Sequence, residues 1–148
     1  MRKVIKLLSP AVWFFLKSYW FVFRPTSYGV KIIITNKNSV LLVRHNYGYK
    51  TWTFPGGCVK KGENKESAIK REIEEEVGIK LDKITFLGHF VSTKEHKKDN
   101  IFVCHSEVKN KNFKKDVFEI KEAKWFDINN PPSLPENSRK ILDFYKNY

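Results

Sequence analysis

The first regular pattern of apolar and polar residues repeats every second position, as the side chains of a strand do. Gly29 to Thr35 is a β-branched run, residues 36–38 form a polar turn, and Ser39 to His45 again alternates. We therefore predict an antiparallel hairpin, preceded by a linker from Pro25 to Tyr28. The residues predicted to share one face of its first strand are Val30, Ile32 and Ile34.

Extended segments also dominate the rest of the chain. Thr51 to Phe54 is short and runs into a Pro-Gly-Gly turn, while Leu81 to Lys94 and Ile101 to Val108 are rich in strand-forming residues. The polar stretch from Glu95 to Asn100 between them predicts a second hairpin. Ile120 to Phe126 is the last predicted strand, and two prolines follow it.

Two segments carry helical patterns instead. Lys65 to Val77 contains no Gly or Pro, follows the N-cap candidate Asn64, and ends at Gly78, which suits a left-handed C-terminal position. Glu136 to Tyr145 predicts a closing helix. Its inward residues are expected to be Ile141, Leu142 and Tyr145. Strands combined with one or two helices make the predicted fold class α+β.

The N-terminal segment is strongly apolar and aromatic. Lys6, Pro10 and Lys17 interrupt it, and the longest uncharged run, Leu7 to Leu16, is too short to cross about 30 Å of hydrocarbon. Large aromatic residues stand where a signal peptide would carry small ones. We expect residues 1–24 to form a helix that lies at an anionic membrane surface.

Two alternatives stay open for this segment, packing on its own domain or across a homodimer, and a transmembrane helix. The basic residues expected to meet lipid head groups are Arg2, Lys3, Lys6, Lys17 and Arg24. Residues 25–148 then form the second, larger unit. We expect a cytoplasmic protein, with peripheral attachment to the inner membrane face as the alternative.

Composition adds a positive charge to this picture. The 148 residues carry 28 Lys and Arg against 16 acidic residues, a formal charge of +12, which favours contact with polyanions. Phosphate compounds, RNA and anionic lipid all qualify, and scattered lysines reflecting base composition are the alternative explanation. Cys58 and Cys104 lack metal-binding spacing and indicate a reducing compartment.

Three glutamates on the first predicted helix carry the candidate chemistry. Glu72, Glu75 and Glu76 are spaced i, i+3 and i+4 and share one face, where their charges repel. Oxygen ligands of this kind suit Mg²⁺ or Mn²⁺, whereas a lone acidic run on a helix is more often a solvated face. The apolar stripe that these glutamates flank consists of Ile69, Ile73 and Val77.

The same residues resemble the Nudix box, the pattern G-x5-E-x7-R-E-U-x-E-E-x-G-U in which U is a bulky aliphatic residue. The matching positions are Gly57, Glu63, Arg71, Glu72, Ile73, Glu75, Glu76, Gly78 and Ile79. The resemblance extends upstream through residues 52–57, and more weakly to residues 119–126. Residues before Pro25 lie outside it.

The resemblance implies a mixed β-sheet sandwiched between α-helices and a loop–helix–loop that holds divalent metal, Mg²⁺ or Mn²⁺. It assigns Glu72, Glu75 and Glu76 as metal ligands, together with the carbonyl of Gly57. Metal ions that bridge phosphate oxygens offset the charge that builds as water displaces one phosphate. The implied activity is hydrolysis of a diphosphate linkage.

Further roles follow from the same resemblance. Glu63 and Arg71 match positions that support the metal site and orient its glutamates, and Glu63 is also a candidate ligand for a further metal ion in the substrate complex. Two kinds of general base stay open, a box glutamate or one on a later loop. The candidates are Glu75 and Glu76, ranked first, and Glu107 and Glu119.

Substrate identity is open. Trp52, Tyr47 and Tyr49 are candidates for stacking a nucleobase, with core packing as the alternative, and Arg44 is a further candidate substrate contact. Residues 94–97 carry neither the proline nor the tyrosine of two known subfamilies. We expect a nucleoside triphosphate, nucleotide sugar or nucleotide alcohol as substrate. A silent nucleotide- or RNA-binding module and a hydrolase of lipid-linked diphosphates are the rival functions.

Overall fold

The computed structural model describes residues 15, 18–19, 26–48, 50–93 and 98–148. The predicted N-terminal helix therefore falls largely outside the described residues, as do Tyr49 and residues 94–97. Its contact with membrane stays a prediction. Within the described part of the chain, no helix combines the length and the apolar character needed to cross a membrane.

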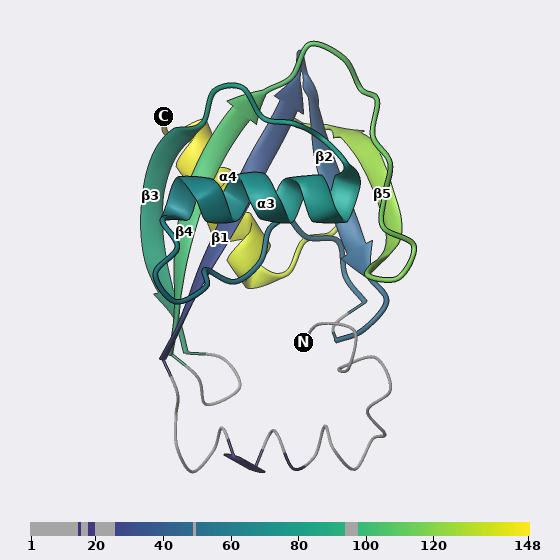
Figure 1. Cartoon of the computed structure of the whole chain (residues 1–148). Coiled ribbons are helices and arrows are strands. Elements are labelled where there is room, and N and C mark those ends of the chain that lie inside the picture. The colour runs from purple at the N-terminus through teal and green to yellow at the C-terminus, as the bar shows by residue number, and fades with distance from the viewer. Residues whose placement is uncertain (1–14, 16–17, 20–25, 49, 94–97) are drawn as a thin grey trace.

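One mixed sheet of five strands forms the centre of the molecule, and its strand order is β3-β4-β1-β2-β5 (Figure 1). The strands are β1 (Thr26–Asn36), β2 (Ser39–His45), β3 (Thr85–Ser92), β4 (Lys98–Glu107) and β5 (Ile120–Asp127). β1 and β4 run parallel, and the other neighbouring strands are antiparallel. The mixed sheet and the α+β class agree with the sequence prediction.

The long parallel pairing corrects two predicted boundaries. β1 begins at Thr26, which lies opposite Lys98 of β4, so most of the predicted linker before Gly29 is strand. The same pairing draws Lys98, Asp99 and Asn100 into β4, where a turn was predicted. Polar residues join the sheet here because their backbone groups find partners on a neighbouring strand, whatever their side chains prefer.

The predicted hairpin of β1 and β2 exists but opens beyond its turn. Its ladder contains Thr35 opposite Val40 and Asn36 opposite Ser39, and the strands then separate. The segment from Thr53 to Cys58 enters the gap, bonding to β2 through Thr53 and to β1 through the carbonyls of Pro55 and Gly57. Within residues 51–54, where a short strand was expected, only Thr53 forms an isolated bridge, with Val43.

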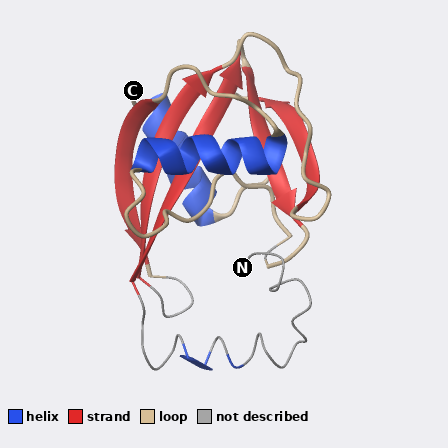
Figure 2. Ribbon diagram, viewed as in Figure 1, coloured by secondary structure: helices blue, strands red, loops and turns tan. Residues whose placement is uncertain are grey.

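Two helices cover opposite faces of the sheet (Figure 2). α3 (Lys65–Val77) begins and ends as predicted, because the Asn64 side chain accepts a hydrogen bond from the Ser67 N–H at 2.7 Å and Gly78 adopts a positive φ of 65°. α4 (Glu136–Lys146) extends one residue beyond the predicted helix.

Each face of the sheet has its own apolar core, as the strand alternation predicts. Val30, Ile32 and Ile34 of β1 pack beneath α3 with Ile69, Ile73 and Val77. The other core lies beneath α4 and contains Ile33, Val40, Leu42, Phe54, Val103, Leu134, Ile141 and Leu142. The two packed layers hold the sheet, α3 and the Pro-Gly-Gly turn in fixed positions.

Candidate active site

Two carboxylates of α3 are buried against the fold. Glu72 and Glu76, one helical turn apart, are 1% and 2% exposed, whereas the Glu75 side chain is 45% exposed. Glu74 points to solvent, as predicted. Buried carboxylates are costly unless hydrogen bonds or cations compensate for lost hydration. The surrounding groups supply part of that compensation, through hydrogen bonds to Glu72 Oε1 and Glu76 Oε2.

Arg71 is the cation that holds the acidic residues together. Its Nε and Nη2 each lie 2.8 Å from an oxygen of Glu63, and its Nη1 lies 2.6 Å from Glu72 Oε1 and 3.6 Å from Glu75 Oε2. Nη2 also donates to the Cys58 carbonyl at 3.1 Å. The guanidinium therefore fixes the box loop to α3.

This pairing shifts the titration of both partners. The hydrogen bonds from Arg71, and then the N–H of Lys60, lower the pKa of Glu63 from 4.5 to about 2. Conversely, Glu63 and Glu72 raise the pKa of Arg71 above its already high ordinary value. At neutral pH Glu63 and Arg71 therefore form an ion pair in which both side chains are charged.

The Pro-Gly-Gly turn binds the second buried carboxylate. The Gly56 N–H donates to Glu76 Oε2 at 2.9 Å. Gly56 has a φ of 133°, and a Cβ there would lie 2.1 Å from the Val30 carbonyl oxygen, so the close approach requires glycine. Lys31 of β1 supports the turn from beside it, donating to the carbonyls of Phe54 and Gly56 at 3.0 and 3.2 Å.

The donor chemistry fits a hard divalent cation. Three carboxylates pair with Arg71 and a fourth accepts the Gly56 N–H, so the formal charges leave an excess of negative charge, and every side-chain donor to a metal would be an oxygen. The acidic residues are Glu63, Glu72, Glu75 and Glu76. In the described part of the chain no three acidic, histidine or cysteine side chains converge in metal-binding geometry, because the carboxylates turn toward Arg71 and Gly56.

Comparison with known proteins identifies the family. A profile described as the NUDIX domain matches residues 25–145. The chain belongs to the Nudix family. An ADP-ribose pyrophosphatase from Methanocaldococcus jannaschii is 32% identical over 139 residues, spanning 88% of this chain and 78% of that protein. Nudix hydrolase 6 from Arabidopsis thaliana is 36% identical over 123 residues, spanning 77% of this chain and 44% of the relative.

Solved structures agree with the fold. The MutT protein from Methanosarcina mazei Go1 superimposes with a TM-score of 0.73 at 25% identity, covering 84% of this chain and 96% of that one. The chain spans less than half the length of several curated relatives it matches, at 44%, 36% and 42%. Membership of the Nudix family thus rests on the domain that these proteins share, residues 25–145 of this chain.

The predicted substrate contacts lie on the α4 side of the Nudix sheet. Arg44 of β2 forms an ion pair with Glu122 of β5 at 2.6 Å, and its guanidinium lies 5.1 Å from the centre of the Trp52 ring. The Trp52 ring packs edge-on against Phe126, with 4.8 Å between the ring centres. This contact is part of the core packing that was the alternative to a stacking role for Trp52. Their contact with substrate stays a prediction.

Tyr47 lies on the connection after β2. Its ring centre is 5.7 Å from that of His45, and the residue is half exposed. Its neighbour Asn46 donates to the carbonyls of Val117 and Phe118, so Tyr47 adjoins the connection between β4 and β5. Tyr49 lies outside the described residues.

The two later-loop glutamates occupy different places. Glu107 ends β4 opposite Thr35, close to the β1–β2 turn. Glu119 precedes β5 and lies three residues after Asp116, whose N–H donates to the Glu76 carbonyl at 2.8 Å. Of the two, Glu119 belongs to the segment that contacts the acidic end of α3.

Sequence reasoning missed the groups that join these elements. Lys31, Asn46 and Asp116 each bond to backbone atoms far away in the sequence, and no spacing in the chain indicates such partners.

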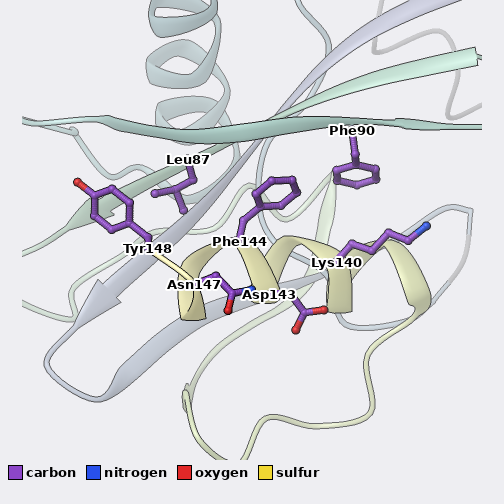
Figure 3. A pocket seen from close by; sticks show the side chains of 7 residues that line it. All are labelled: Leu87, Phe90, Lys140, Asp143, Phe144, Asn147 and Tyr148. Atoms are coloured by element: carbon purple, nitrogen blue, oxygen red, sulfur yellow. The ribbon is translucent and has the colours of Figure 1, made fainter.

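A separate pocket of about 520 Å³ lies between β3 and α4, where Leu87, Phe90 and Phe144 line it (Figure 3). None of the box residues lines that pocket.

Proposed function

We propose that this Nudix protein is a metal-dependent pyrophosphohydrolase acting on a nucleoside diphosphate joined to another group, such as a nucleoside triphosphate, nucleotide sugar or nucleotide alcohol. The burial of Glu72 and Glu76 beside Arg71 and the Gly56 N–H carries this proposal. A fold gains no stability from burying two carboxylates at such a place. Their retention is explained by a need for negative charge at a defined position.

Mg²⁺ or Mn²⁺ is the proposed cofactor. Glu72, Glu75, Glu76 and the Gly57 carbonyl would hold it, and when bound it would neutralise the negative oxygens of the diphosphate. The Gly57 carbonyl already accepts the Val30 N–H at 2.9 Å, which fixes its position through β1. The turn and the helix would thus supply ligand oxygens to the metal ion from two segments of the chain.

Arg71 is a positioning residue in this proposal. It holds Glu63 and Glu72 in place, and its contact with Glu75 at 3.6 Å is the longest of the ion pairs it forms with these three glutamates. Glu75 is also the most exposed of the three. We therefore assign Glu75 as the first candidate to accept a proton from the attacking water, with Glu76 as the second.

Substrate binding is assigned to the α4 side of β2 and β5 and to the connection after β2. Arg44 offers positive charge for a phosphate, and Trp52 and Tyr47 offer aromatic rings for a base. Lys124 also lies over the Trp52 ring, 5.8 Å from its centre. Residues 25–148 form the proposed catalytic unit, since these assignments need no residue before them.

The test is hydrolysis by the purified protein. We expect release of phosphate or a nucleotide from at least one member of a panel of nucleoside triphosphates, nucleotide sugars, ADP-ribose and CDP-alcohols, with either metal ion and not with EDTA. Glu75→Gln and Glu76→Gln should lower turnover by about 10² or more, and Glu74→Gln, a solvent-exposed change on the same helix, should preserve it. Tight nucleotide binding without turnover would favour the binding module instead.

A further inference from the structure

Two neighbouring apolar side chains are exposed on the turn that leads into β5. Val117 and Phe118 are 66% and 69% exposed. Single exposed apolar residues are ordinary, but an adjacent aliphatic and aromatic pair on a turn is a small apolar surface of the kind that contacts ligands. We call Val117 and Phe118 the turn platform.

Hydrogen bonds hold the turn platform rigidly. Asn46 Nδ2 donates to the Val117 and Phe118 carbonyls at 3.0 and 2.9 Å, and the Phe118 N–H donates to Asp116 Oδ1 at 2.8 Å. The Ile120 N–H closes the turn on the Asp116 carbonyl at 2.8 Å. A rigid backbone lowers the entropy lost when a ligand binds an exposed ring.

The same turn is anchored to the acidic helix. The Asp116 N–H donates to the Glu76 carbonyl at 2.8 Å, and the Lys114 N–H donates to the Val77 carbonyl at 2.9 Å. Phe118 is two residues beyond Asp116, so their Cα atoms are at most about 8 Å apart. In Figure 1 the connection between β4 and β5 runs down beside the C-terminal end of α3 and reaches the end of β2.

We propose that the turn platform binds the nucleobase of the substrate whose diphosphate lies at the α3 carboxylates. This inference rests on the proposed function and changes one assignment made there, because it moves the base contact from Trp52 on the α4 side to the turn platform beside α3. An aromatic ring held beside a phosphate-binding site offers a base a face to stack on, and such stacking tolerates any base.

Tyr47 is a second exposed aromatic residue close in sequence to the contact with the turn platform. It follows Asn46, whose side chain binds the turn platform, so the two aromatic residues belong to segments that one side chain joins. This arrangement places the base at the junction of β2, β5 and α3.

Binding measured with and without a base tests the inference. We would titrate the full chain, in Mg²⁺, with α,β-methylene-ATP and with inorganic tripolyphosphate, using calorimetry. Phe118→Ala should weaken binding of the nucleotide analogue about fivefold or more and leave tripolyphosphate binding within twofold. Phe118→Trp should retain nucleotide binding, because it preserves an aromatic face.

Tyr148→Ala is the matched control, because it removes an exposed ring at the far end of α4. It should change neither affinity. The inference is overturned if Phe118→Ala weakens both ligands equally or weakens neither, or if the parent binds the two ligands with equal affinity. Phe118-dependent nucleotide binding by a protein without turnover would reject the hydrolase activity and still support the turn platform.

Discussion

α3 and α4 cover opposite faces of the same sheet, but they bury different kinds of side chain. α4 buries Ile141 and Leu142 and one small polar residue, Ser138. α3 buries a comparable apolar stripe and adds two carboxylates, Glu72 and Glu76. One helix is thus built chiefly to stabilise the sheet, while the other also maintains a charged site.

The difference shows how such a site is maintained at low cost to the fold. Replacing a buried ion pair with apolar residues is often neutral or stabilising, so the charges of α3 are not explained by stability. They persist because Arg71 donates to Glu72 and the Gly56 N–H donates to Glu76, while Asn64 caps the helix that carries them. α4 needs none of these, and its first turn lacks a side-chain cap.

The largest expected effect is on catalysis by α3. Glu76→Gln should lower kcat by about 10² to 10⁴, which is the contribution of a positioned acid–base group. The loss should be larger if Glu76 is also a metal ligand. It should leave the free energy of unfolding without metal unchanged or slightly higher, because a buried charge is removed. Steady-state kinetics and urea unfolding check this, and a large loss of stability would contradict the contrast with α4.

Next in size is the effect of removing the central cation. Arg71→Met should reduce the free energy of unfolding by about 2 to 4 kcal/mol, because Glu72 stays buried and loses a charged partner. The double change with Glu72→Gln should recover part of that loss. Urea unfolding measures both, and a loss below about 0.5 kcal/mol would show that the network adds little.

For α4 we expect the opposite result, a loss of stability without a loss of catalysis. Ile141→Ala should lower the free energy of unfolding by about 2 to 4 kcal/mol, since it leaves a cavity in the core beneath α4. At temperatures where the variant is folded, its kcat should equal that of the parent. A kcat that falls with the stability would show that the two faces are coupled.

A smaller effect is expected at the helix cap that α3 has and α4 lacks. Asn64→Ala removes the acceptor for the Ser67 N–H and should cost about 1 kcal/mol. Asn64→Ser retains a capping oxygen and should recover most of it. Thermal unfolding of the three proteins decides whether the cap stabilises α3.

The smallest effect concerns acid stability. Because the pKa of Glu63 is lowered from 4.5 to about 2, its contribution is present above about pH 4.5 and is lost as the pH falls toward 2. Glu63→Gln should therefore lose less stability across this range than the parent. The pKa of Glu122 is also lowered by Arg44, so the comparison uses unfolding curves of both proteins and reads only the difference. Parallel curves would contradict the ion pair.

Local patterns predicted the parts of the fold that depend on neighbours in sequence. The bounds of α3 and β2 follow from Asn64, Gly78 and the alternation of β2, because helix caps and strand faces are set within a few residues. The other box residues came from the resemblance to the family pattern, whereas the three helix carboxylates were found in the same way as the caps, since i, i+3 and i+4 spacing places them on one helix face. Their gathering around Arg71 extends that prediction.

Contacts between distant segments account for the rest. Thr26 joins β1 because Lys98 lies opposite it, 72 residues further along the chain. The gap between β1 and β2 admits the Pro-Gly-Gly turn, and this brings the Gly56 N–H to Glu76. The turn platform likewise depends on Asn46 and α3. Hydrogen bonds and packing across the sheet select these partners, and a periodic pattern of apolar residues contains no information on which strand lies beside which.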